Sequence, residues 1–194
     1  MAEISAYSQA KPASFGALLR YSAASGAAAL IVLGLDQLTK WLARIYLPPL
    51  ENGSIPVVGD VFRLTYVLNR GAAFGVLQNQ NALFIVVSGI VIAVIIGSYR
   101  YSSTRSRLLN LALGLQLGGA IGNLIDRVRL GYVVDFLDVR LPSQLHPILG
   151  MERWPVFNVA DSAIVMGVAI LALHLLVSPS AGPPAPQTEP GESR

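Results

Sequence analysis

Asp161 places a carboxylate at the mouth of a stretch that is apolar enough to lie in lipid. The stretch, FNVADSAIVMGVAILALHLLV, begins at Phe157, and its apolar part runs over residues 163–177. Asn158 stands three residues before Asp161, so a helix would bring the two side chains to one face. Because an ionised carboxylate is costly to keep at the edge of hydrocarbon, the pattern indicates a functional group with a partner.

Other aspartates and asparagines lie where further apolar stretches end. Asp36 and Lys40 are four residues apart. Asn123 and Asp126 are three apart, and each of these pairs would share one face of a helix. One interpretation of the first pair is an ordinary ion pair near the interface, with Lys40 extending toward water. The alternative is a polar site to which several helices contribute.

Two aspartates compete to be the partner of Asp161. Asp126 is followed by Arg127, whose charge favours an ionised carboxylate and therefore a structural role. Asp135 stands in the apolar run GYVVDFLDVRL, and apolar surroundings together with a second carboxylate raise the pKa of such a group. A carboxyl group that holds a proton near neutral pH suits acid–base catalysis, so we predict that Asp135 is the partner.

The available residue types argue against most other hydrolytic sites. The sequence has no cysteine, no HExxH or GxSxG motif, and only two histidines, His146 and His174. A zinc site and a thiol nucleophile are therefore not expected. A serine–lysine dyad would need Lys40, and no serine is obviously paired with it. Two aspartates that share one proton could activate water and polarise a carbonyl, which is aspartyl-protease chemistry without metal or cofactor.

Four apolar stretches are long enough to cross a bilayer, which takes about 20 residues per helix. They are residues 21–41, 82–99, 108–125 and 158–177. With 53% apolar residues, 13% charged residues and a mean hydropathy of +0.56, the chain departs far from the composition of a soluble domain. We therefore predict an all-α membrane protein with four transmembrane helices. The scattered basic residues give no sign of nucleic-acid binding.

Loop charges set the expected orientation. The loop RYSSTRSR between the second and third spans carries three arginines and no acid, and short basic loops stay in the cytoplasm. Both termini would then be cytoplasmic, and the polar site would face outside. Residues 1–18 and the proline-rich residues 178–194 are expected to be disordered tails around one domain, residues 19–177. A monomer would suffice for such a site.

The first outer loop contains a pattern typical of a β-hairpin. Within IPVVGDVFRLTYVLN, apolar and polar residues alternate in part, and Gly59-Asp60 would form the turn. An open sheet cannot lie in hydrocarbon, so the hairpin is expected at the outer interface. In the second outer loop, Asp138 is expected to be a solvated charge and Trp154 a residue of the aromatic belt.

Five motifs, in their order and spacing, resemble those of bacterial lipoprotein signal peptidase, also called signal peptidase II. They are DQLTK at residues 36–40, NRGAAFG at 69–75, GNLIDR at 122–127, VVDF at 133–136 and WPVFNVADS at 154–162. The resemblance covers about residues 21–177. It implies a four-helix aspartyl endopeptidase of the bacterial inner membrane, with an extracytoplasmic active site and a small β-cradle near residues 55–70.

The resemblance also implies a substrate and a set of residue roles. Enzymes of this family remove the signal peptide from prolipoproteins by cleaving on the N-terminal side of a cysteine that carries a diacylglyceryl group. The antibiotic globomycin inhibits them. Membrane lipid is the remaining implied partner, and no cofactor or metal is implied. The implied catalytic pair is Asp135 and Asp161, the substrate-binding residues are Asn69, Asn123, Arg127 and Asn158, and the supporting residues are Asp36, Lys40, Asp126 and Ala160.

Two other functions would also use aspartates at a membrane. A small transporter or proton relay would usually place its polar residues near the midplane and carry inverted repeats, and no repeat is evident here. A non-enzymatic assembly subunit would explain the small residues on the third span, but not the paired acids. Those small residues are Gly118, Gly119, Ala120 and Gly122.

Overall fold

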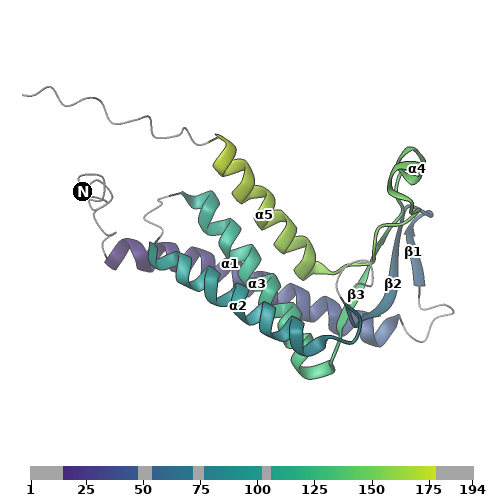
Figure 1. Ribbon diagram of the computed structural model, residues 1–194, viewed down its shortest axis with the longest axis horizontal. Helices are drawn as coiled ribbons and strands as arrows, with labels where there is room; N and C mark the ends of the chain where they lie inside the picture. The colour runs from purple at the N-terminus through teal and green to yellow at the C-terminus, as the bar shows by residue number, and fades with distance from the viewer. Residues whose placement is uncertain (1–14, 48–53, 72–76, 102–105, 178–194) are drawn as a thin grey trace, which may run out of the picture.

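The computed structural model describes residues 15–47, 54–71, 77–101 and 106–177, with a helical part and a small sheet at one end of it (Figure 1). Four of the described helices are long and apolar enough to cross a membrane. They are α1 (Phe15–Tyr46), α2 (Asn81–Tyr101), α3 (Arg107–Leu130) and α5 (Val159–Val177). A 3-10 turn, η4 (Ser143–Leu145), and the single turn α4 (His146–Leu149) lie in the segment that joins the sheet to α5.

The four predicted spans are confirmed as helices, and two of them end about five residues later than expected. Helix α1 ends at Tyr46 rather than at residue 41, and α3 ends at Leu130 rather than at residue 125. The last turns of α1 extend under the sheet, where Ala43 and the adjoining Leu47 belong to a buried apolar cluster. Helix α1 also begins at Phe15, so residues 15–18 are helical, whereas most of the two expected tails lies outside the described residues.

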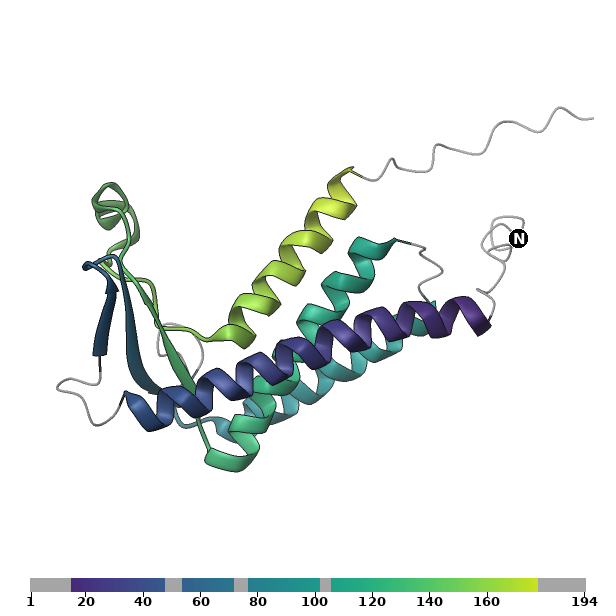
Figure 2. The ribbon, with the colours of Figure 1, turned by 180° about the vertical axis from the view of Figure 1, so that it is seen from behind.

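Helix α3 lies between the other three long helices and contacts each of them. Its small residues permit this approach, because a Cβ atom on Gly114 or Gly118 would meet the backbone of α1, and one on Gly119 would meet the backbone of α5. Helix α5 leans away from α1 toward the end that is remote from the sheet (Figures 1 and 2). The ends of α1, α3 and α5 that lie near the sheet are therefore where side chains from all three helices can meet.

The sheet has three antiparallel strands in the order β1–β2–β3. Strands β1 (Ser54–Val58) and β2 (Phe62–Asn69) form the predicted hairpin, and its turn contains Gly59 with φ +49°. Strand β3 (Val133–Val139) was not foreseen as a strand. It is buried along most of its length, so its sequence lacks the alternation that a half-buried strand shows. Its pairing with β2 sets Asp135 opposite Val67.

The two faces of β3 have different partners. Val134 and Phe136 pack against Ala43 and Leu47 at the end of α1. Since successive side chains of a strand point to opposite faces, Asp135 points away from that cluster. The chain after α4 then returns alongside β3, with isolated bridges that pair residues 137 with 157 and 140 with 153.

Candidate active site

A pocket of about 580 Å³ opens between the sheet and the nearby ends of α3 and α5. Its walls come from the end of β2, from β3, from the segment before α5 and from the two helices. It extends along α5 to Val165. This residue is 66% exposed and lies in one of the helices that are apolar enough to span a membrane. Five of the residues singled out from the sequence line it: Asn69, Asn123, Arg127, Asp135 and Asp161.

Asp135 is held from both sides by side-chain amides. Asn69 donates from Nδ2 to Oδ2 of Asp135 at 2.9 Å, and Asn158 donates from Nδ2 to Oδ1 at 2.7 Å. The β2–β3 pairing places Asn69 at the strand end beside Asp135, and Asn158 comes from the approach to α5. The carboxyl group of Asp135 is 1% exposed, so both of its oxygens are fixed without help from bulk water.

Asp161 lies in the first turn of α5 and is fixed by two other N–H groups. Asn123 donates from Nδ2 to Oδ1 at 2.8 Å, and the backbone N–H of Asn158 donates to Oδ2 at 3.2 Å. In return, the backbone N–H of Asp161 donates to Oδ1 of Asn158 at 2.9 Å, which is the reciprocal pattern of a helix N-cap. Asn158 therefore contacts both pocket aspartates, because its amide nitrogen donates to the Asp135 carboxyl group and its backbone N–H donates to the Asp161 carboxyl group.

The two aspartates are also coupled through their charges. Burial raises the pKa of the Asp135 carboxyl to about 7, and the negative charge of Asp161 contributes to the rise. The hydrogen bonds from Asn69 and Asn158 oppose the shift without cancelling it. Near neutral pH the site can therefore hold a proton on Asp135.

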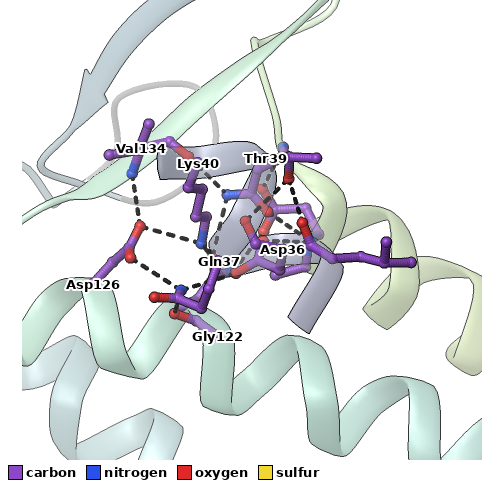
Figure 3. A network of polar contacts seen from close by, with 12 residues as sticks. Asp36, Gln37, Thr39, Lys40, Gly122, Asp126 and Val134 are labelled. Atoms are coloured by element: carbon purple, nitrogen blue, oxygen red, sulfur yellow. Dashed lines mark hydrogen bonds and ion pairs between the residues drawn. The ribbon is translucent and has the colours of Figure 1, made fainter. Parts of the chain in front are cut away.

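A second polar cluster is centred on Lys40 (Figure 3) and adjoins the pocket at Asn123, which lines the pocket and contacts Lys40. The Lys40 ammonium contacts Oδ2 of Asp36 at 3.0 Å, Oδ2 of Asp126 at 3.2 Å and Oδ1 of Asn123 at 2.9 Å. The expected pair of Asp36 and Lys40 is thus present. Of the two interpretations of this pair, the one in which Lys40 extends toward water is wrong, because the residue is 2% exposed and its three donors are used inside the protein.

The carboxylates of this cluster hold the backbone beside each pocket aspartate. Asp36 accepts the backbone N–H of Ala160 at 2.9 Å, one residue before Asp161. Asp126 accepts the backbone N–H of Val134 at 3.1 Å, one residue before Asp135 (Figure 3). The four supporting residues therefore form one arrangement that can set the separation of the two pocket aspartates.

The contacts that Gln37 and Asn123 make in this cluster could not be predicted from the sequence. Gln37 donates from Nε2 to Asp36, to Asp126 and to the backbone oxygen of Gly122, at 3.2, 3.3 and 3.2 Å. Nothing about a glutamine within DQLTK signals this role. Asn123 accepts at Oδ1 from both Lys40 and Asn158, at 2.9 and 3.2 Å, and this turns its amide nitrogen toward Asp161.

Arg127 joins the pocket to the start of α2. Its guanidinium donates from Nη2 to the backbone oxygen of Gly71 at 3.3 Å and lies over the ring of Phe84, 4.8 Å from the centroid. Asn81 donates from Nδ2 to the backbone oxygen of Arg127 at 3.0 Å. The guanidinium of Arg127 therefore lies at the pocket with several N–H donors, and the hydrogen bond to Gly71 uses only Nη2.

Asp138 is not the solvated loop charge that we expected. It is 6% exposed, because β3 pairs with β2 on one side and with the returning chain on the other. Its oxygens accept from Nη1 of Arg153 and from Oγ1 of Thr65, each at 2.9 Å. Trp154, expected only in the aromatic belt, lines the pocket together with Pro155, so sequence reasoning also missed this wall.

Among residues 15–47, 54–71, 77–101 and 106–177, no three histidine or acidic side chains come together in a group that could hold a metal ion. The charged and amide side chains that line the pocket are those of Asp135, Asp161, Asn69, Asn123, Gln78, Arg70 and Arg127.

Comparison with known proteins assigns the family. A family model described as signal peptidase (SPase) II matches residues 28–177. A lipoprotein signal peptidase of Moorella thermoacetica is 51% identical over 149 residues, which cover 77% of this chain and 90% of that protein. One of Halothermothrix orenii is 49% identical over 146 residues, 75% of this chain and 90% of that protein.

A solved structure has a similar fold. It is described as a bacterial membrane enzyme structure by the in meso method at 1.9 Å resolution, with a TM-score of 0.66 and 28% identity. The similarity covers 87% of this chain and 98% of that one. With motifs, family match and fold in agreement, the chain belongs to the signal peptidase II family.

Proposed function

We propose that this multi-pass membrane protein is an aspartic endopeptidase that removes signal peptides from prolipoproteins. The cleaved bond is the one on the N-terminal side of a cysteine that carries a diacylglyceryl group. The observation that carries the proposal is the pair of aspartates in one pocket, joined through Asn158, of which Asp135 has a pKa raised to about 7. Membership of a peptidase family favours hydrolysis over a transporter or an assembly subunit.

The proposed reaction divides acid and base between the two carboxyl groups. The ionised Asp161 takes a proton from a water molecule, and the resulting hydroxide attacks the scissile carbonyl carbon. The protonated Asp135 gives its proton to the carbonyl oxygen, which yields a tetrahedral diol. Asp161 then passes its proton to the leaving nitrogen, the C–N bond breaks, and the new carboxylic acid returns a proton to Asp135.

The amides around the dyad keep its geometry fixed during this cycle. Asn69, Asn123 and Asn158 supply the donors to the two carboxyl groups, so the groups need not reorganise when a substrate arrives. Arg127 has guanidinium donors at the pocket that can bind a carbonyl oxygen of an extended substrate. These four residues are the proposed substrate-binding set.

The position of the pocket suits a substrate that stays in lipid. Ile164 and Val165 carry its lining into α5, and the exposed Val165 would contact lipid if α5 spans the membrane. A diacylglyceryl group could remain in the bilayer while the peptide bond beside it enters sideways. By the distribution of arginines in the loops, we place the pocket at the extracytoplasmic face of the inner membrane, where globomycin-type inhibitors would compete with substrate.

The test is a cleavage assay on purified protein in detergent. The substrate is a synthetic prolipoprotein peptide with a diacylglyceryl-modified cysteine, and the comparison peptide has the same sequence without the lipid. We expect the wild type to cut only the lipidated peptide and to retain its rate in EDTA. The variant Asp161→Asn should lose turnover. Equal cutting of both peptides, or a rate that EDTA removes and zinc restores, contradicts the proposal.

A further inference from the structure

One wall of the pocket is a short run of chain with no regular secondary structure of its own. Residues 154–157, here called the wall segment, are consecutive, and all four line the pocket. The segment follows the edge of β3 and is attached at its two ends. At the α5 end, Phe157 and Leu137 exchange backbone hydrogen bonds of 3.1 and 2.8 Å. At the other end, the backbone N–H of Trp154 donates to the oxygen of Val139 at 2.9 Å.

The two attachments serve different parts of the site. The Phe157 end continues directly into Asn158, which contacts both pocket aspartates. The Trp154 end lies beside Val139, the last residue of β3. It is preceded by Arg153, whose side chain neither lines the pocket nor bonds to Asp135 or Asp161. A change at Arg153 can therefore move the wall without touching the catalytic groups.

Arg153 joins three parts of the sheet through one guanidinium. Its Nη1 donates to Oδ1 of Asp138 at 2.9 Å, and its Nη2 donates to Oδ1 and to the backbone oxygen of Asp60 at 2.6 and 2.9 Å. Asp138 is on β3, and its second oxygen is fixed by Thr65 of β2. Asp60 is in the turn of the β1–β2 hairpin. Arg153 serves the two carboxylates from two different nitrogens, Nη1 and Nη2, and a lysine has only one nitrogen to offer at this position.

Because Asp138 is buried, its contact with Arg153 can hold the wall segment more firmly than an exposed ion pair would. Exposed ion pairs contribute little, and Asp60 is half exposed, so that pair alone would not hold a wall in place. Asp138 is almost fully buried, and loss of the guanidinium donor at its Oδ1 leaves a buried carboxylate oxygen without its hydrogen bond. The sheet would then rearrange at this point, and the freed end of the wall segment would move with it.

We propose that Arg153 is a positioning residue that sets substrate affinity by holding the wall segment against β3 through Asp138 and Asp60. The inference rests on the proposed function, because it assigns the wall segment to the binding of the lipidated peptide. The dyad end of the segment stays attached, so Arg153 acts on binding and leaves the chemical step unchanged.

The test compares Arg153→Lys with Arg140→Lys. Arg140 pairs with the same Asp60 and with Glu152 at the exposed rim, so it undergoes the same chemical change without reaching Asp138. We expect Arg153→Lys to raise KM by about tenfold with kcat within about twofold of the wild type, because binding common to ground state and transition state is lost. Arg140→Lys should retain both constants. Asp138→Asn is the second variant and should also raise KM.

A binding measurement separates this inference from the proposed function. The chain has two tryptophans, so Trp41→Phe leaves Trp154 of the wall segment as the only one. The probe is the lipidated peptide with its scissile bond reduced, titrated against Trp154 fluorescence. A midpoint that is about tenfold weaker in Arg153→Lys and unchanged in Arg140→Lys supports the inference. Equal midpoints in a folded Arg153→Lys, or a fall in kcat at constant KM, overturns it. A wild type that neither binds the probe nor cuts the unreduced lipidated peptide contradicts the proposed function and the inference with it.

Discussion

At the scale of single residues, the surroundings distinguish aspartates that look alike in the sequence. The apolar neighbours of Asp135 already favoured it over Asp126, and the structure brings Asp135 into the pocket with Asp161. The place of Asp126 could not be predicted, because it depends on Lys40, which lies on another helix. Burial of Lys40 likewise depends on Asn123 and Asp126, which lie more than 80 residues from it in the chain. Catalysis by Asp135 and Asp161 stays a prediction.

The pKa of Asp135 sets an expected pH dependence. Its raised value of about 7 means that the carboxyl group carries its proton below that pH and loses it above. Because the proposed reaction needs a protonated Asp135, kcat/KM should fall as the pH rises through about 7. The measurement is the initial rate of lipidated-peptide cleavage between about pH 5 and pH 9. A rate that rises across this range would assign the proton to another group.

Arg127 offers a test of the guanidinium fork. Arg127→Lys keeps the charge but loses the planar fork, so it loses the simultaneous contact with Gly71, the ring of Phe84 and a substrate carbonyl. We expect a clear loss of cleavage or of inhibitor binding, about tenfold or more, in a protein that still folds in detergent. Thermal unfolding provides the folding control. Wild-type kinetics in Arg127→Lys would reduce Arg127 to an interface anchor.

At the scale of helices and strands, the sequence predicted where these elements form better than it predicted which of them lie side by side. Hydrophobic length was enough for the four spans, and partial alternation with Gly59-Asp60 was enough for the hairpin. Strand β3 was missed because a strand buried on both faces shows no period-two pattern. Because the pairing of β3 with β2 brings Asn69 beside Asp135, the hydrogen bond between these two side chains could not be predicted from the sequence either.

The close packing of α3 on α5 gives a prediction at this scale. A Cβ atom on Gly119 would meet the backbone oxygen of Ala160 and would lie 2.8 Å from Cγ1 of Ile164. Gly119→Ala should therefore push α5 away and displace Asp161 from Asn123. We expect about 1–3 kcal/mol of lost stability and a lower rate of cleavage. Gly89→Ala on α2 is the control, because its Cβ would meet nothing within 4 Å.

Thermal unfolding in detergent and the peptide assay are the two measurements for this pair of variants. Gly89→Ala should match the wild type in both. If Gly119→Ala matched it too, the packing of α5 on α3 would not fix the position of Asp161.

At the scale of the whole molecule, the polar residues gather at one end of the helices. The pocket and the Lys40 cluster both lie where α1, α3 and α5 meet the sheet, and the start of α1 lies at the opposite end (Figures 1 and 2). This convergence on one side was predicted from the positions of the aspartates at the ends of the spans. The distances within it depend on which helices touch, and apolar composition does not determine that.

The orientation in the membrane is a prediction about the molecule as a whole. The arginine-rich loop between α2 and α3 should remain in the cytoplasm, which places the pocket outside. A reporter that is active only outside the cytoplasm should be silent when fused after Arg105 and active when fused after Asp138. The opposite pattern would move the pocket to the cytoplasmic side and remove the proposed access to prolipoproteins.

The central claim is that Asp135 and Asp161 form the catalytic pair, and one comparison tests it most directly. The measurement is the rate at which folded Asp135→Asn and Asp126→Asn cut the lipidated peptide, with binding of a globomycin-type inhibitor as the check on the pocket. Asp135→Asn should lose about 10³-fold or more of the turnover while it still binds the inhibitor, because acid–base transfer and charge stabilisation both fail. Asp126→Asn should act through stability or binding, since its carboxylate holds Lys40 and the backbone of Val134. Near-normal turnover in Asp135→Asn beside a folded but inactive Asp126→Asn would contradict the account.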